Sequence, residues 1–156
     1  MQRPIIYIDE SGFAHDMPRT HGYRAKGLRC FGKKDWGAKG RTNVIGALMD
    51  KTLLCSCLLN CNVDSEVFHI WVTQQLLPVA PSNAVIVMDN ATFHKRQDTQ
   101  NAIAKAGMTL EFLPPYSPQL NPIENLWAKA KAIRRRLRCS ISELFDSHLH
   151  NSFNLN

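Results

Sequence analysis

Hydrophobic and polar positions divide the chain into short apolar runs and longer stretches with a helical period. The apolar runs have the length and the β-branched content of buried strands. They lie at residues 4–9, 42–49, 52–59, 84–88 and 108–113. Only two residues separate the second run from the third, which predicts a tight hairpin turn, although the glycine that such turns favour is absent.

Apolar residues spaced three and four apart predict helices between and after these strands. The predicted helices cover residues 64–77, 96–106 and 122–138, and the tail permits one more at 142–149. Residues 11–40 are rich in Gly, Lys, Arg and His without a clean period, so we interpret them as a long loop or an irregular hairpin. Three early strands followed by alternating helices and strands indicate an α/β domain with one mixed sheet and helices on its faces.

The composition is that of a globular protein with one domain. The chain has 156 residues, which is long enough for a sizeable core, and its 44% hydrophobic and 21% charged content is not that of a disordered chain. No apolar stretch approaches the roughly 20 residues that a membrane-spanning helix needs. The N-terminus lacks a signal-peptide pattern. We therefore expect no membrane partner and a cytoplasmic location.

The cysteines are odd in number and irregularly spaced. Three of the five lie close together, at Cys55, Cys57 and Cys61, which raises the possibility of a zinc site. No second CxxC or HxxxH pair completes such a site, and the three cysteines lie in or beside an apolar run. Buried, reduced thiols are therefore the favoured interpretation, with zinc binding as the alternative.

Three carboxylates occupy positions where catalytic acids are found in sheets of this kind. Asp9 and Asp89 each follow an apolar strand, and Glu124 lies in the first turn of the last long helix. At about 4 Å and an effective dielectric near 20, each pair of like charges costs about 4 kcal/mol, so clustered carboxylates need a cation, usually a divalent metal. Taken singly, each has a simpler explanation, because Asp is common in turns and Asn121 to Glu124 resembles a capping box.

The last long helix carries an apolar stripe and a separate charged edge. The stripe consists of Ile123, Leu126, Trp127, Ala130, Ile133 and Leu137. Glu124, Lys131 and Arg135 follow a different line on the helix, where a carboxylate and two cations could hold a metal and then follow a phosphate backbone. A solvated basic face explains the cations equally well. The net charge of +6 makes nucleic acid the first partner to consider.

Three segments make the sequence recognisable. Residues 7–12 (YIDESG), 85–94 (VIVMDNATFH) and 113–127 (LPPYSPQLNPIENLW) closely resemble the catalytic domain of bacterial insertion-sequence transposases of the mariner-related DDE superfamily. The 34 residues between Asp89 and Glu124 are the spacing that this group uses. The long proline-rich third block is the most specific of the three motifs.

The resemblance implies a ribonuclease-H-like fold, a mixed five-stranded sheet flanked by helices, and an enzyme that cuts and joins DNA. It implies that Asp9, Asp89 and Glu124 are the catalytic residues and hold two Mg²⁺ ions, for which Mn²⁺ substitutes. Glu10 is not a member of this set, because neighbouring strand residues point to opposite faces. Double-stranded DNA, as transposon ends and target, is the implied substrate, and a homodimer is the implied active form.

Residues near the three acids are expected to support them or to contact DNA. We place Asn90, His94 and Lys95 in this group, with Lys131 and Arg135 as further DNA contacts. For His94, a surface loop position or a helix cap is the alternative.

The chain differs from full-length relatives at its N-terminus. We interpret residues 1–156 as a single catalytic domain without the N-terminal helix-turn-helix domain of those relatives. We expect either the second frame of a split element, joined to an upstream frame's product, or a truncated remnant that acts near the bacterial nucleoid. A catalytically incomplete fragment that serves as a regulatory or DNA-binding partner is the alternative function.

Overall fold

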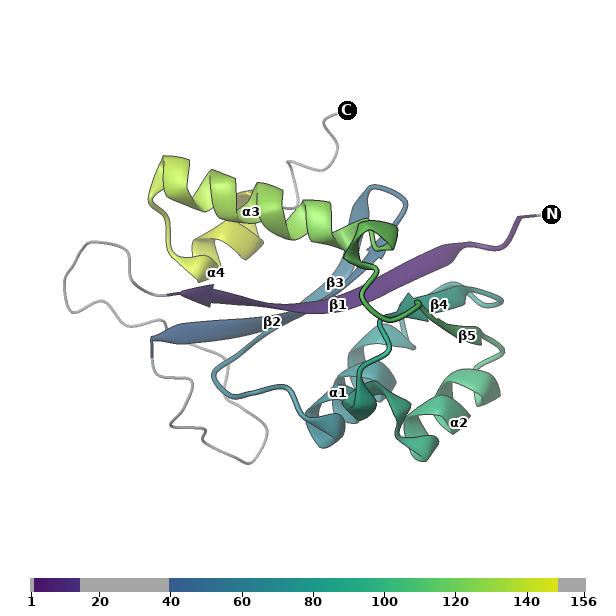
Figure 1. Cartoon of the computed structure of the whole chain (residues 1–156). Coiled ribbons are helices and arrows are strands. Elements are labelled where there is room, and N and C mark those ends of the chain that lie inside the picture. The colour runs from purple at the N-terminus through teal and green to yellow at the C-terminus, as the bar shows by residue number, and fades with distance from the viewer. Residues whose placement is uncertain (1, 15–39, 149–156) are drawn as a thin grey trace.

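The computed structural model describes residues 2–14 and 40–148. Its centre is a five-stranded sheet with the strand order β3-β2-β1-β4-β5 (Figure 1). The strands are β1 (Ile5–Ala14), β2 (Arg41–Met49), β3 (Thr52–Leu59), β4 (Val85–Met88) and β5 (Thr109–Phe112). Strands β1, β2 and β3 pair antiparallel, whereas β4 runs parallel to both β1 and β5. The predicted mixed five-stranded sheet is therefore confirmed.

The helices lie in two layers, one on each face of the sheet (Figure 1). The layer on one face contains α3 and α4, and the layer on the other contains α1 and α2. Their bounds are α1 (Ser65–Trp71), α2 (Gln97–Lys105), α3 (Ile123–Leu137) and α4 (Ile141–Glu143). Shorter helical turns are η2 (Val72–Leu76), η3 (Thr92–Lys95), η4 (Pro118–Leu120) and η5 (Leu144–His148).

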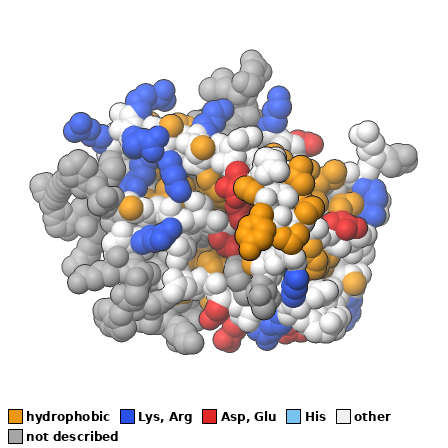
Figure 2. All heavy atoms as spheres, viewed as in Figure 1, with side chains coloured by type: hydrophobic (Ala, Val, Ile, Leu, Met, Phe, Trp, Pro, Cys, Tyr) orange, Lys and Arg blue, Asp and Glu red, His pale blue; other side chains and the backbone are white. Residues whose placement is uncertain are grey.

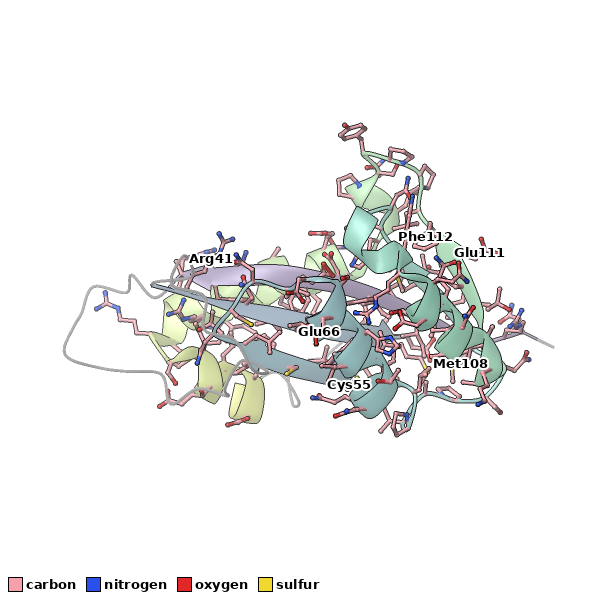
Figure 3. The ribbon with its side chains drawn as sticks, turned by 90° about the horizontal axis from the view of Figure 1, so that it is seen from below. Arg41, Cys55, Glu66, Met108, Glu111 and Phe112 are labelled. Atoms are coloured by element: carbon pink, nitrogen blue, oxygen red, sulfur yellow. The ribbon has the colours of Figure 1, made fainter. Side chains whose placement is uncertain are left out.

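Each layer buries its own hydrophobic core against the sheet. On the α1 side, Phe68 and Trp71 are fully buried against strand residues such as Ile8 and Ile86. This is the side that faces the viewer in Figure 3, where α1 and α2 lie in front of the strands. The sheet is therefore covered on both faces, which explains why β1 and β4 are continuous apolar runs without alternation.

On the α3 side, the predicted apolar stripe packs against β1 and β2. Trp127 makes an edge-to-face contact with Phe13 at 6.3 Å between ring centroids. A Cβ at Gly46 of β2 would lie 2.7 Å from the Trp127 ring, so only glycine admits the indole this close to the sheet. Leu137, which the helical pattern assigned to the stripe, is 45% exposed because it lies in the last turn of α3.

Most predicted elements are present, but β1 and the helix predicted at 64–77 differ from the prediction. Strand β1 continues to Ala14, because Ala14 pairs with Arg41 of β2, so residues 11–14 are not part of a loop. The predicted helix at 64–77 begins at the expected cap, Asp64, but changes to a π-helical turn after Trp71. Most of the loop predicted at 11–40, residues 15–39, lies outside the described residues.

The structure corrects the expectation for one cysteine and also tests the described helices for a membrane span. Cys55, Cys57 and Cys139 are free thiols, but Cys61 is disulfide-bonded, so the expectation of reduced cysteines is wrong for Cys61. Its partner lies outside the described residues. In the described part of the chain, no helix is both long enough and apolar enough to cross a bilayer.

Candidate active site

Two neighbouring residues of β1 present carboxylates to opposite faces of the sheet. The Asp9 carboxylate accepts a hydrogen bond from Trp127 Nε1 on the α3 side, at 3.2 Å. Glu10 instead contacts His94, which packs against Phe68 on the α1 side. The alternation of side chains along a strand therefore separates Asp9 from Glu10, as the sequence predicted.

Asp9 is a buried acid beside a second carboxyl group. It is 6% exposed, and its carboxyl lies within hydrogen-bonding reach of Glu124. Burial raises the pKa of Asp9 to about 9, and the contact with Glu124 and the negative charges of Glu10 and Glu124 add to this. At neutral pH Asp9 therefore keeps its proton in the metal-free protein.

Asn121 fixes the start of α3 next to β1. Its side-chain oxygen accepts a hydrogen bond from the Ile123 backbone N–H at 3.3 Å, and its amide nitrogen donates to the Ile8 carbonyl at 3.5 Å. The capping box considered for Asn121 and Glu124 does not form, because the helix lacks a side-chain cap at Pro122 and Glu124 contacts Asp9. The first turn of α3 therefore points Glu124 at the acid on β1.

Asp89 is level with Asp9 in the sheet but binds a different partner. Tyr7 of β1 pairs with Val87 of β4, so Asp9 and Asp89 each stand two residues further along their strands. Asp89 Oδ1 lies 2.9 Å from His94 Nδ1 and accepts the Ala91 backbone N–H at 3.1 Å. Both bonds end on Oδ1, so neither uses Oδ2. The contact with His94 is the main reason that the pKa of Asp89 is lowered.

His94 joins Asp89 to Glu10 inside the protein. Its side chain is fully buried, and Nε2 lies 3.1 Å from both Glu10 carboxylate oxygens. Burial lowers the pKa of His94, but the bonds to Asp89 and Glu10 outweigh that effect and raise it to about 10. The imidazole is therefore positively charged at neutral pH and donates from both ring nitrogens.

A cavity of about 390 Å³ opens between the segments that follow β4 and β5 and the first turn of α3. Asp89 and Glu124 both line it, together with Asn90 and the proline-rich segment 113–118. Tyr116 in that segment is 99% exposed and has a positive φ of 57°, which is unusual for a tyrosine. Figure 2 shows acidic side chains at the centre of this face, between a hydrophobic patch and the Lys and Arg side chains over α3.

The structure brings two of the three predicted acids into contact. Asp9 meets Glu124 directly, and Glu124 shares the cavity with Asp89, whose carboxylate is held by His94. Within residues 2–14 and 40–148, no three histidine, cysteine, aspartate or glutamate side chains stand close enough together to hold one metal ion as they are placed. The donor set itself is entirely carboxylate oxygen, which is the chemistry that Mg²⁺ and Mn²⁺ prefer.

The residues expected to contact DNA are placed differently from one another. Asn90 and Lys95 are exposed beside the second strand end, and Lys95 lies 5.5 Å from the Phe112 ring centroid. Arg135 is exposed on α3, and Lys131 lies 5.1 Å from the Phe13 ring centroid. His94 is buried and binds Asp89, which is the supporting role expected for residues near the acids and not a surface contact with DNA. The alternative of a surface position for His94 is wrong.

Sequence reasoning did not find the residues that hold the acids in place. Trp127 was assigned only to the apolar stripe, and its N–H is the group that reaches Asp9. Asn121 was considered only as a helix cap, whereas it also binds β1. The position of Glu10 next to Asp9 on a strand predicted that its side chain faces the opposite side of the sheet. It did not predict the contact with His94 on that side.

Comparisons with known proteins show the family and the fold of the chain. The family model described as DDE superfamily endonuclease matches residues 4–144. The chain is 29% identical over 131 residues to the Tc3 transposase of Caenorhabditis elegans, which covers 79% of this chain and 40% of that protein. The chain therefore spans well under half the length of this curated relative.

Solved structures show the same fold at low sequence identity. The catalytic domain of Mos1 mariner transposase superposes with a TM-score of 0.64 at 14% identity, covering 97% of this chain and 70% of that chain. The Mos1 transposase paired-end complex with the left transposon end gives a TM-score of 0.59 at 17% identity, covering 83% and 41%. The predicted ribonuclease-H-like fold is therefore confirmed.

Proposed function

Because the chain belongs to the DDE superfamily endonuclease family, we propose that it is the catalytic domain of a mariner-type DDE transposase. In this role it hydrolyses phosphodiester bonds at the ends of a mobile element and then joins the freed 3′-hydroxyl group to target DNA. The observation that carries the proposal is the contact between Asp9 and Glu124 beside a cavity that Glu124 shares with Asp89. These are the residues that the family motif assigns to catalysis.

The three acids fit a pair of Mg²⁺ ions by the chemistry of their donor atoms. Asp9 would be shared by both ions, with Asp89 on one and Glu124 on the other, and Mn²⁺ would substitute. The raised pKa of Asp9 supports this assignment, because a cation can replace the proton that Asp9 keeps at neutral pH. When bound, such ions activate the attacking oxygen and stabilise the leaving oxygen.

The chain's own residues prepare this chemistry before any ion binds. Trp127 donates to Asp9 Oδ2 and fixes that carboxyl group, while Asn121 holds the start of α3 against β1. Buried apolar side chains around Asp9 exclude water, which strengthens its interaction with any cation that arrives. Release of the Asp9 proton is therefore part of assembling the active site.

DNA is the proposed substrate, and its phosphates are the groups to be bound. We expect Asn90 in the cavity wall and the exposed Lys95 to contact the strand being cut. Lys131 and Arg135 follow Glu124 along α3, and their positive charges suit the phosphate backbone. We further propose that the chain acts as a homodimer on double-stranded DNA in the bacterial cytoplasm, joined to or aided by an upstream frame's product.

A cleavage assay tests the proposal. The purified chain is incubated with supercoiled plasmid and with linear duplex, with Mg²⁺, Mn²⁺ or EDTA. We expect nicking that needs the metal and is lost in Asp89→Ala and Asp9→Ala. Glu111→Gln, which removes one exposed carboxylate on β5 away from the cavity, is the control and should cut normally.

Two results would contradict the proposal. Equal nicking by wild type and Asp89→Ala would identify a contaminating nuclease. DNA binding without cleavage under any metal condition would favour the alternative function, a regulatory or DNA-binding partner.

A further inference from the structure

Glu10, His94 and Asp89 form a connected chain of charged groups behind the proposed catalytic acids. Glu10 belongs to β1, His94 to η3, and Asp89 follows the last residue of β4. We propose that Glu10 is a positioning residue that acts through His94 to fix the carboxylate of Asp89. This inference rests on the proposed function, because it assigns Glu10 a part in preparing that active site.

The histidine ring is held at both nitrogens. Nε2 lies 3.1 Å from each Glu10 carboxylate oxygen, and Nδ1 lies 2.9 Å from Asp89 Oδ1 and 3.2 Å from the Asp89 carbonyl oxygen. Phe68 packs on the ring with the centroids 4.6 Å apart. A rotation of the ring would break bonds at both ends, so the position of Glu10 determines the direction of the Nδ1–H group.

Asp89 needs such a support because the sheet no longer holds it. Strand β4 ends at Met88, and the Asp89 side chain is 48% exposed. His94 and the Ala91 N–H both bind Oδ1, which selects one orientation of the carboxylate and leaves Oδ2 for another ligand. Without His94, one backbone N–H alone would orient a half-exposed side chain.

Glu10 is well suited to anchor this chain because β1 is rigid. It pairs with Ile45 in the centre of the sheet, and its side chain is only 16% exposed. Its neighbour Asp9 faces the other side of the same strand. Strand β1 therefore fixes Asp9 directly, and it fixes Asp89 through the side chains of Glu10 and His94. The positions of both acids thus depend on the same strand.

The distinguishing variant is Glu10→Gln in the full chain. It keeps the length of the side chain and an acceptor oxygen but removes the charge that holds the imidazole. We expect its Mn²⁺ dissociation constant, measured from the signal of free Mn²⁺ in electron paramagnetic resonance, to rise about 10-fold, as for other residues that orient metal ligands. Glu111→Gln makes the same change at an exposed site on β5 and should bind Mn²⁺ like wild type.

A double-mutant cycle shows whether Glu10 acts through His94. In a His94→Gln background, adding Glu10→Gln should weaken Mn²⁺ binding no further, because the link is already broken. Losses that simply add, or Mn²⁺ affinity of Glu10→Gln within twofold of wild type, would overturn the inference.

A metal-free measurement separates this inference from the proposed function. In protein with ¹⁵N-labelled histidine, we expect Glu10→Gln to shift or broaden both ring N–H signals of His94, including the Nδ1–H that points at Asp89. A change confined to Nε2–H would overturn the inference. If wild type neither binds Mn²⁺ nor cuts DNA, the proposed function fails, while this spectrum still decides whether Glu10 reaches Asp89.

Discussion

The two faces of the sheet place carboxylates close together and neutralise them in different ways. On the α3 face, Asp9 lies beside Glu124 and keeps a proton at neutral pH, because its pKa is raised to about 9. On the α1 face, Glu10 and Asp89 are bridged by a buried, charged His94, whose pKa is raised to about 10. Both arrangements solve the same problem of repulsion between neighbouring negative charges.

The two faces differ in whether the positive charge that neutralises the carboxylates can be exchanged. A proton exchanges readily for a metal ion, whereas a histidine is a fixed part of the chain. We therefore propose that the α3 face accepts a cation and that the α1 face is a permanent support. Asp89 connects the two, because it binds His94 and also lines the cavity beside Glu124.

The largest expected effect comes from replacing Asp9. Asp9→Asn keeps the shape of the side chain and its hydrogen bond with Trp127 but removes a metal ligand. We expect metal-dependent DNA nicking to fall by about 1,000-fold or more, the scale seen when one member of a catalytic unit is lost. The midpoint of thermal unfolding should not fall, because the variant no longer buries an ionisable group. A variant that retains cleavage would remove Asp9 from the site.

The next effect is the pH dependence of stability that Asp9 contributes on the α3 face. The folded protein raises the pKa of Asp9 from 3.8 to about 9, so between these values it binds a proton that the unfolded chain has released. The stability from this group is complete below about pH 3.8 and is lost as the pH rises toward about 9.

Urea unfolding of wild type and Asp9→Asn in EDTA tests this dependence. Relative to the variant, wild type should become steadily less stable between pH 4 and pH 9. A difference that does not change with pH would show that Asp9 titrates normally.

A smaller effect is expected from removing the fixed cation on the α1 face. His94→Ala leaves Glu10 and Asp89 without the charge between them and opens a cavity beside Phe68. We expect a loss of about 3 kcal/mol in the free energy of unfolding at pH 7, at the low end for broken buried ion pairs because Asp89 is half exposed. The neighbouring exposed variant Lys95→Ala should change stability by about 0.5 kcal/mol or less. Equal values for the two would mean that the bridge does not stabilise the fold.

The smallest effect concerns the single hydrogen bond from Trp127 to Asp9. Trp127→Phe removes the N–H donor and part of a buried ring. Trp71→Phe is a matched control, because Trp71 is equally buried and its N–H has no hydrogen-bond partner among the described residues. We expect Trp127→Phe to cost about 1 kcal/mol more than Trp71→Phe in chemical denaturation. A larger loss for Trp71→Phe would contradict the role given to the bond.

Local patterns in the sequence were sufficient for the fold, and they led to the prediction of the three acids. Strand runs ending in Asp9 and Asp89 and the helix at Glu124 were visible because burial and helical period leave a direct mark on residue type. The length of β1 was underestimated because its second half, up to Ala14, is held by pairing with β2. That pairing joins segments distant in sequence.

His94 was expected to support the acids or to contact DNA, but the residues that it binds could not be predicted from local patterns. His94 and Glu10 lie 84 residues apart, and only the packing of η3 under β1 brings them together. The capping box expected at Asn121 gave way to tertiary contacts with Ile8 and Asp9. Such contacts depend on how the helices pack against the sheet, so they leave no pattern in the spacing of residues along the chain.

We propose that the adjoining carboxyl groups of Asp9 and Glu124 belong to a metal-binding catalytic centre. The most direct test is anomalous diffraction from crystals of the chain soaked in Mn²⁺ at a concentration that supports DNA cleavage. We expect a Mn²⁺ peak with Asp9 among its ligands and either Asp89 or Glu124 beside it. Mn²⁺ peaks only at sites that do not include Asp9 would contradict it.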